Sequence, residues 1–316
     1  MECEWRDKTI LPCRYYIKDQ YCSLDNFFLC IEARKRKAPR ISHSELSTYG
    51  KCYRMWWLSY MVGLERVNPP IRLLAGKIFS ECLDQILSIK PTSTYQEVIQ
   101  KYSGYKDEKG EFPRELLCIQ AWMEALEQLP IAEEKGRTQY ETWTTDLDYP
   151  AVHCFLDWVR LDGDGKESYA KEFKYSANPD GWSKFTLGNQ LGTYFWAVGV
   201  NRIEAVVFKV PLLKIKKGKN EESGEEFKDR VRKEILLNKL EYITKQNYYR
   251  NEFNLEEVKH RYQVMTKELY DRMQVGESAF YMTDDRERCF KCSFLEICAN
   301  DGIVSEQLYK KKERKK

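Results

Sequence analysis

The middle of the chain constrains the fold most. Residues 151–161 (AVHCFLDWVRL) are rich in β-forming residue types, and residues 167–175 (ESYAKEFKY) form a second such segment. Between them lies Asp162-Gly163-Asp164-Gly165, and Asp-Gly pairs in such a context predict a β-hairpin. A helical pattern over 187–198 and an apolar strand over 203–210 follow. This order of strand, strand, helix and strand predicts a small α/β core.

The flanking segments are predicted to be mainly helical, so the chain has a helical N-terminal part. An N-cap at Ser44 opens a helix that carries an aromatic group around Trp56 and Trp57. Residues 214–222 read as a basic loop. Residues 139–147 alternate weakly. Amphipathic periodicity predicts helices at 73–87, 115–129, 225–249 and 255–273.

Composition excludes only a few classes of protein. The net charge of +3 neither indicates nor excludes a nucleic-acid partner, and no apolar run approaches the roughly 20 residues of a membrane-spanning helix. The N-terminal residues show no secretory signal pattern, so we expect a cytoplasmic protein with reduced thiols. Without repeats or long linkers, we expect an N-terminal extension of unclear role (1–40), one domain (41–300) and a disordered basic tail (301–316).

Two carboxylates and a lysine lie in the predicted hairpin. Glu172 and Lys174 are two residues apart and therefore share one face of their strand. If Asp164-Gly165 forms the turn, Asp157 lies opposite Glu172, with Cβ atoms about 5 Å apart. Two carboxylates this close favour a hard divalent cation between them, Mg²⁺ or Mn²⁺. Lys174 could then hold the attacking water or neutralise charge on a phosphate.

This interpretation has two alternatives. If Asp162-Gly163 forms the turn, Asp157 faces Ser168 and the pairing is lost. The three side chains could also form weak ion pairs on the surface of a hairpin.

The next helix favours the metal site. Gln190 and Tyr194 are four residues apart and share one helical face. Together with Asp157 and Glu172-Phe173-Lys174, they resemble the RecB-like branch of the PD-(D/E)xK nuclease superfamily.

The resemblance spans roughly residues 41–300 and implies a restriction-endonuclease-like core, a mixed central sheet flanked by helices. It also implies that Asp157, Glu172 and the main-chain carbonyl of Phe173 bind the catalytic metal. Lys174 would activate water, and Gln190 and Tyr194 would support the site or contact DNA.

The opening segment of the resemblance, Ile41 to Tyr49 followed by Cys52, also fits, and Glu141 is a candidate for a further acidic position. Two positions depart from the family pattern. Cys154 replaces a usual glycine, and Ser80 replaces a usual metal-binding histidine, for which a hydroxyl is a poor substitute. Three explanations stay open: fewer protein ligands with extra water, a contribution from Glu81 or Asp84, or weakened activity.

A cysteine cluster stands near the C-terminus. Cys289, Cys292 and Cys298 form C-x2-C-x5-C, and a fourth ligand must come from a remote cysteine because the chain has no second C-x2-C pair. The pattern is similar to AddB-type nuclease domains and CRISPR-associated spacer-acquisition exonucleases. That resemblance implies a 4Fe-4S cluster on Cys52 and these three residues, joining the N- and C-terminal parts. Zinc, or no metal, stays open.

The other seven cysteines divide into two groups. Three lie in apolar segments and are interpreted as core residues: Cys82, Cys118 and Cys154. Four lie near the N-terminus and match no metal-binding motif: Cys3, Cys13, Cys22 and Cys30.

We therefore expect a Mg²⁺- or Mn²⁺-dependent deoxyribonuclease that acts as an exonuclease or on single strands and ends. Its setting would be recombination, repair, CRISPR adaptation or phage DNA processing, with a helicase, recombination or CRISPR-type protein as partner. The rival hypotheses are a DNA-holding scaffold that has lost its chemistry and a redox protein. His43, His153 and His260 fit no catalytic motif. Candidate DNA contacts are Arg54, Trp57, Lys214, Lys216 and Lys217.

Overall fold

The computed structural model describes residues 41–67, 69, 71–105, 113–144, 152–160, 169–182, 184–218, 221–290, 292–300 and 304–312. The predicted extension with its four cysteines (Cys3, Cys13, Cys22, Cys30) and the hairpin turn at 162–165 lie outside these residues.

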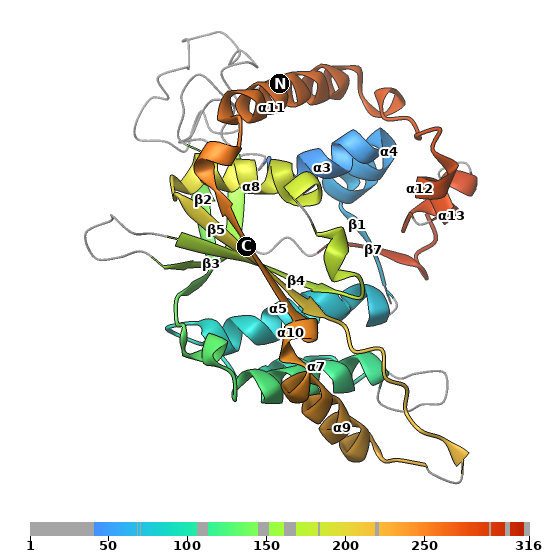
Figure 1. The fold of residues 1–316 in the computed structure, drawn as a ribbon. Helices are drawn as coiled ribbons and strands as arrows, with labels where there is room; N and C mark the ends of the chain where they lie inside the picture. The colour runs from blue at the N-terminus through green and yellow to red at the C-terminus, as the bar shows by residue number, and fades with distance from the viewer. Residues whose placement is uncertain are drawn as a thin grey trace.

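A five-stranded mixed sheet forms the centre of the fold (Figure 1). Its order is β2-β3-β4-β5-β6, in which β4 and β5 are parallel and the other neighbours antiparallel. The three predicted strands are confirmed as β3, β4 and β5, and each of their ends lies within two residues of the predicted one. The weakly alternating segment 139–147 overlaps a further strand, β2. The bounds are β2 Arg137–Trp143, β3 His153–Arg160, β4 Tyr169–Ser176, β5 Arg202–Lys209 and β6 Ile243–Tyr249.

Helices cover both faces of this sheet. Figure 1 shows α3, α8 and α11 on one side and α5, α7 and α9 on the other. The residues of β4 alternate between the two layers: Ala170 packs with the first, and Phe173 with the second. The first layer comprises α3 His43–Lys51, α8 Lys184–Val198 and α11 Leu255–Val275; the second comprises α5 Ile71–Leu87, α6 Tyr95–Lys101, α7 Arg114–Leu126 and α9 Gly224–Leu237.

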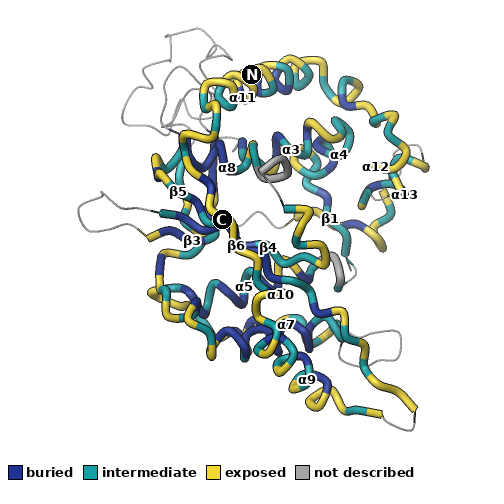
Figure 2. Tube along the Cα trace, in the orientation of Figure 1, coloured by how far each residue is buried: buried dark blue, intermediate teal, exposed yellow. Residues whose placement is uncertain are grey.

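The two layers enclose two separate apolar cores, one on each face of the sheet. Burial is greatest in the central strands and in the inward faces of the helices, as the dark segments of Figure 2 show. The predicted core thiols Cys82, Cys118 and Cys154 are all buried, with at most 2% of their surface exposed. Short turns complete the fold: η2 Pro130–Glu133, η3 Pro179–Gly181, η5 Arg250–Glu252 and η6 Glu277–Ala279.

Two helix predictions were wrong in detail. The N-cap of α3 is Ser42 rather than Ser44, because the Ser42 Oγ accepts from the Glu45 N–H at 3.1 Å. The predicted helix 225–249 ends at Leu237, continues as the single turn α10 (Lys239–Tyr242) and becomes strand β6. β6 is an edge strand whose residues 244–247 are exposed and polar, so it lacks the apolar alternation of a half-buried strand.

The predicted disordered tail is wrong in part. Tyr309–Lys311 form β7, which pairs antiparallel with β1 (Leu64–Arg66) in a separate two-stranded sheet. Tyr309 is buried in a third apolar cluster with Leu58, Phe294 and Ile297. This cluster joins the N- and C-terminal parts, which are α4 Tyr53–Trp56, the π-helix η1 Trp57–Val62, α12 Arg286–Phe290 and α13 Leu295–Ala299.

Among the described residues, no helix has the combination of length and apolar content that crossing a membrane requires.

Candidate active site

The register of the hairpin places the two carboxylates together. Trp158 pairs with Lys171, Val159 with Ala170 and Arg160 with Tyr169, which is the register that a turn at Asp164-Gly165 predicts. The ladder ends at Trp158, but one further step of the same register would bring Asp157 opposite Glu172, and the charge of Glu172 acts on Asp157.

Regular pairing between β3 and β4 stops at Asp157. The Phe173 N–H donates to the Asp157 Oδ2 at 2.8 Å, so a side chain takes the position that a main-chain acceptor would otherwise fill. This bond fixes the Asp157 carboxylate between the two strands and beside Glu172.

Glu172 is almost fully buried, with 1% of its surface exposed. Its Oε1 accepts from the Lys174 ammonium and from the Gln190 Nε2 at 2.8 Å. Gln190 also donates to the Tyr194 hydroxyl oxygen at 2.7 Å, as expected from their shared face of α8. The structure therefore brings together all five predicted catalytic residues, from β3, β4 and α8.

The charges in this group are out of balance. Burial, followed by the charge of Glu172, raises the pKa of Asp157 well above its usual value. Burial lowers the pKa of Lys174, but the Glu172 and Asp157 carboxylates outweigh this effect and raise it. One ammonium thus faces two carboxylates, and a bound cation would balance the remaining negative charge.

The surroundings of one oxygen atom, the Glu172 Oε2, indicate whether a metal ion fits this site. The Glu172 Oε2 is buried and has no hydrogen-bond partner among the described residues. An unpartnered buried carboxylate oxygen is costly unless a cation occupies the adjacent position. Oxygen ligands from Asp157, Glu172 and the Phe173 carbonyl suit Mg²⁺ or Mn²⁺, and Mg²⁺ usually keeps several waters.

The site is not a closed set of metal-binding side chains. Within the described part of the chain, no three His, Cys, Asp or Glu side chains are arranged to hold one metal ion. A metal ion at this site would therefore need ligands other than side chains, such as the Phe173 carbonyl and water.

Helix α5 contributes a third carboxylate near the site. Burial raises the pKa of Asp84 to about 7, and the charge of Asp84 in turn raises the pKa of Asp157. Ser80 lies one turn earlier on the same helix. Glu81, the other candidate, accepts from the Tyr102 hydroxyl at 3.0 Å and lies 3.7 Å from the Lys77 ammonium, so it is engaged away from Asp157.

Two residues near the site were not predicted. The Lys174 ammonium lies 5.3 Å from the ring centre of Trp182, and His43 Nδ1 is 2.5 Å from the Tyr262 hydroxyl. Burial, and then the positive charge of Lys174, lower the pKa of His43 to about 4. A sequence signal existed for Trp182, the aromatic residue between the second strand and its helix. Glu141, the further acidic candidate, instead pairs with His153 at 2.7 Å.

The four predicted cluster cysteines lie near enough for their thiols to influence one another, but among the described residues no three of them converge on one metal ion. Burial raises the pKa of the Cys292 thiol, and the neighbouring Cys52 and Cys289 raise it further. Cys298 shows the same pattern, with Cys292, Cys52 and Cys289 as its neighbours. The Cys52 and Cys292 sulfurs each accept a main-chain N–H at 3.4 Å, and all four thiols are free. Such N–H bonds also stabilise the thiolates that bind iron-sulfur clusters.

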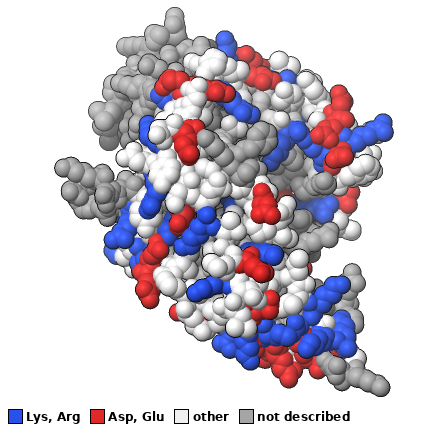
Figure 3. Space-filling view, in the orientation of Figure 1, with Lys and Arg blue, Asp and Glu red and all other residues white. Residues whose placement is uncertain are grey.

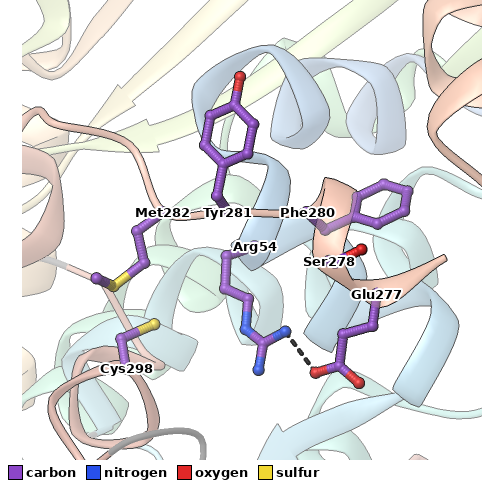
Figure 4. Close-up of a pocket in the computed structure, with 7 residues that line it drawn as sticks. All are labelled: Arg54, Glu277, Ser278, Phe280, Tyr281, Met282 and Cys298. Atoms are coloured by element: carbon purple, nitrogen blue, oxygen red, sulfur yellow. Dashed lines mark hydrogen bonds and ion pairs between the residues drawn. The ribbon is translucent and has the colours of Figure 1, made fainter. Parts of the chain in front are cut away.

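The candidate DNA contacts fall into two groups. Arg54 pairs with Glu277 at 2.6 Å and lines a pocket of about 380 Å³ that Cys298 also lines (Figure 4), while Trp57 stacks on Phe280. These two side chains therefore have packing roles within the protein. The loop lysines Lys214, Lys216 and Lys217 are exposed beside α9, where Figure 3 shows basic and acidic side chains side by side.

The fold and the site define an α/β domain with a carboxylate centre where two strands part. The chain belongs to the PD-(D/E)XK nuclease superfamily, whose family model matches residues 40–299. Members are typically metal-dependent nucleases that use divalent ions such as Mg²⁺ and act on DNA.

The crystal structure of SSO0001 is similar, at 12% sequence identity and a TM-score of 0.38, over 86% of this chain and 95% of that chain. No functionally curated protein matches the chain.

Proposed function

We propose that the protein is a Mg²⁺- or Mn²⁺-dependent deoxyribonuclease with its active site at Asp157, Glu172 and Lys174. The observation that carries this proposal is the buried Glu172 Oε2, which has no partner among the described residues and lies in a site with excess negative charge. A divalent cation held by Asp157, Glu172 and the Phe173 carbonyl would satisfy both conditions.

Each residue has a role that its contacts support. The metal, when bound, would supply Lewis-acid activation of water and of the scissile phosphate. Gln190 fixes the Glu172 carboxylate from α8, and Tyr194 fixes Gln190 in turn. The Lys174 ammonium, between Glu172 and the Trp182 ring, is placed to orient the attacking water and to stabilise negative charge on the phosphate.

Within the superfamily, we place the chain in the RecB-like branch, as an exonuclease or a single-strand or end-processing enzyme. The support is the order of Asp157, Glu172-Phe173-Lys174 and Gln190-x3-Tyr194, together with the cysteine cluster. Recombination, repair, CRISPR adaptation or phage DNA processing would be its cytoplasmic setting, with a helicase, recombination or CRISPR-type partner.

We also propose that Cys52, Cys289, Cys292 and Cys298 bind a 4Fe-4S cluster. Cys52 and Cys289 both raise the thiol pKa of Cys292 and of Cys298, and all four thiols are free, which supports a shared ligand. A cube holds each thiolate on a different iron atom, so it does not need the close convergence of ligands around one ion. Anaerobically purified protein should be brown, with about four irons per chain. A colourless preparation with stoichiometric zinc would contradict this.

Cleavage of end-labelled DNA in Mn²⁺ tests the active site. Glu172→Gln removes a metal ligand with little change of volume, and Lys174→Ala removes the ammonium. Each should lower the rate roughly 100-fold or more. The matched controls Glu141→Gln and Lys245→Ala change an exposed carboxylate and an exposed ammonium on neighbouring strands and should keep wild-type rates. If both site variants fold and cut like wild type, the assignment is wrong.

A second candidate function rests on Ser80, which stands where the resemblance implies a metal-binding histidine. In that case the domain would hold DNA as a scaffolding subunit without cleaving it. Retention of DNA by wild-type protein with no metal-dependent products, on 5′- and 3′-labelled single and double strands, would favour this candidate.

A further inference from the structure

Trp182 has a fixed place in the turn that joins β4 to α8. The start of this turn is tied to the end of β5, because the Val210 N–H donates to the Ser176 carbonyl at 2.9 Å. The Asn178 N–H donates to the Ser176 Oγ at 3.1 Å, and the Trp182 N–H donates to the Pro179 carbonyl at 3.1 Å. Pro179 opens the short helix η3, and its ring fixes φ there. The turn therefore holds the main chain of Trp182 in one position.

The Trp182 ring lies on the same side of the sheet as the catalytic lysine. Trp182 is half-buried and packs against the core beneath α3, α8 and α11. Ala170 of β4 packs in this core, and alternate strand residues share one face, so Glu172 and Lys174 also point to this side. The Lys174 ammonium lies 5.3 Å from the centre of the Trp182 ring, which is within the range of a cation–π contact.

The Lys174 ammonium has more hydrogen-bond donors than partners. A lysine ammonium carries three N–H groups, and the Glu172 Oε1 accepts from one of them. With the other described residues, Lys174 forms no hydrogen bond. The Trp182 ring attracts the positive charge and takes up no N–H group as a conventional acceptor would. Two donors therefore remain, whereas a second carboxylate in the place of the ring would occupy one of them.

We propose that Trp182 is a positioning residue for catalysis: its ring holds the Lys174 ammonium beside Glu172 so that two N–H groups stay available to the attacking water and to a phosphate oxygen. Lysine is a long side chain with many rotamers, and Glu172 alone anchors only one end of it. The ring supplies the second contact that restricts the ammonium to one place. This inference rests on the proposed nuclease function.

Single-turnover cleavage of end-labelled DNA in Mn²⁺ tests this role. Trp182→Leu keeps an apolar side chain but removes the ring, and the rate constant at saturating protein should fall about tenfold. The protein concentration that gives half of this rate should stay the same, because Lys174 acts on the reacting groups rather than on DNA binding. Trp182→Phe keeps an aromatic face and should stay within about threefold of wild type.

A second variant shows whether Trp182 acts through Lys174. Adding Trp182→Leu to Lys174→Ala should not slow cleavage further, since the ring then has no ammonium to hold. The matched control is Trp143→Leu, which removes another half-buried tryptophan, one that stacks on His153 at 4.2 Å. Trp143→Leu and Trp182→Leu should both lower the free energy of unfolding, but Trp143→Leu should keep the wild-type rate constant.

The position of the ammonium can also be measured without metal or DNA. In wild-type protein 18% of the Lys174 side chain is exposed, so acetic anhydride should label it slowly, as followed by mass spectrometry of the peptides. Trp182→Leu should raise the labelling rate of Lys174 several-fold because the ammonium is no longer confined. Trp182→Phe and Trp143→Leu should label like wild type.

The results separate this inference from the proposed function. If Lys174→Ala cuts slowly and Trp182→Leu cuts and labels like wild type, the positioning role is wrong and the active site stands. If Trp182→Leu changes only the half-saturating concentration, the ring contacts DNA and the positioning role is again wrong. If Lys174→Ala itself cuts like wild type, the proposed site fails and the role of Trp182 fails with it.

Discussion

At the scale of single residues, His43 shows how contacts between helices fix a protonation state. Thr193 Oγ1 lies 2.6 Å from the Asn189 carbonyl and 2.8 Å from the Tyr262 hydroxyl. Its single proton serves the carbonyl, which can only accept, so Tyr262 donates to Thr193 and accepts from His43 Nδ1–H. Burial lowers the pKa of His43 to about 4, so the ring is neutral at pH 7, and with its proton on Nδ1 the lone pair lies on Nε2.

This protonation state predicts a pH dependence of stability. The pKa of His43 in the folded protein, about 4, lies below that of an unfolded histidine, near 6.5. As pH falls from about 6.5 to 4, the unfolded state gains a proton that the folded state does not, so stability is lost, up to about 3 kcal/mol. His43→Gln should reduce this loss in urea titrations between pH 4 and 7. An equal loss in that variant and in the control His260→Gln would contradict the prediction.

A close approach predicts a second residue-scale effect. A Cβ on Gly136 would lie 2.2 Å from the ring of Trp158, which is fully buried. Gly136→Ala should therefore destabilise the protein by about 1–3 kcal/mol in denaturant unfolding. In the control Gly188→Ala the new Cβ meets nothing within 4 Å in the middle of α8, and stability should rise by roughly 0.5–1 kcal/mol. Equal effects at both glycines would count against the packing argument.

At the scale of elements, the sequence predicted those helices and strands in which apolar residues recur with a clear helical or strand period. The hairpin register, α8 and β5 follow from apolar runs and an Asp-Gly turn, and so the carboxylates and Gln190 could be placed before any coordinates. β6 was predicted as helix because its exposed residues carry no strand period.

Two features near the site could not be predicted: the contact of the Trp182 ring with Lys174 and the positive φ of Gln139. The sequence shows Trp182 as an aromatic residue between β4 and α8, but a tertiary contact and a main-chain angle leave no pattern in it.

The pairing of β1 with β7 predicts the effect of a truncation. Ending the chain at Ser305 removes Tyr309, whose hydroxyl donates to the Ser293 carbonyl at 2.8 Å beside the cysteines. We expect a lower melting temperature and loss of bound iron, since the third apolar cluster loses a buried ring. The control ends the chain at Lys312 and keeps β7. Full iron content in the shorter protein would show that β7 does not support the cluster.

At the scale of the whole molecule, charge is distributed rather than concentrated. The net charge is only +3, and basic side chains stand beside acidic ones over α9 (Figure 3). DNA affinity must then depend on local groups such as the exposed loop between β5 and α9, and not on a general positive field.

This distribution predicts the salt dependence of DNA binding. Replacing Lys214, Lys216 and Lys217 with Ala should weaken single-strand binding and reduce the slope of log K against log salt by about 2, since each phosphate contact contributes roughly 0.7. The rate at saturating DNA should not change, because the loop is not part of the site. The control replaces Lys233, Lys239 and Lys245, exposed on α9, α10 and β6. If the slope of log K against log salt is the same in both triple variants, the loop does not contact DNA.

The antiparallel pair of β1 and β7 also governs the order in which the molecule assembles. Its strands come from opposite ends of the described chain, so they can pair only after a very long loop has closed, and such contacts form slowly and late. Cys52 and the three C-terminal cysteines share this constraint. The thiols should therefore remain apart and exposed to oxidation while the central sheet is already folded. The β1–β7 pair and the cysteines beside it should also be the first part of the molecule to open under mild denaturation.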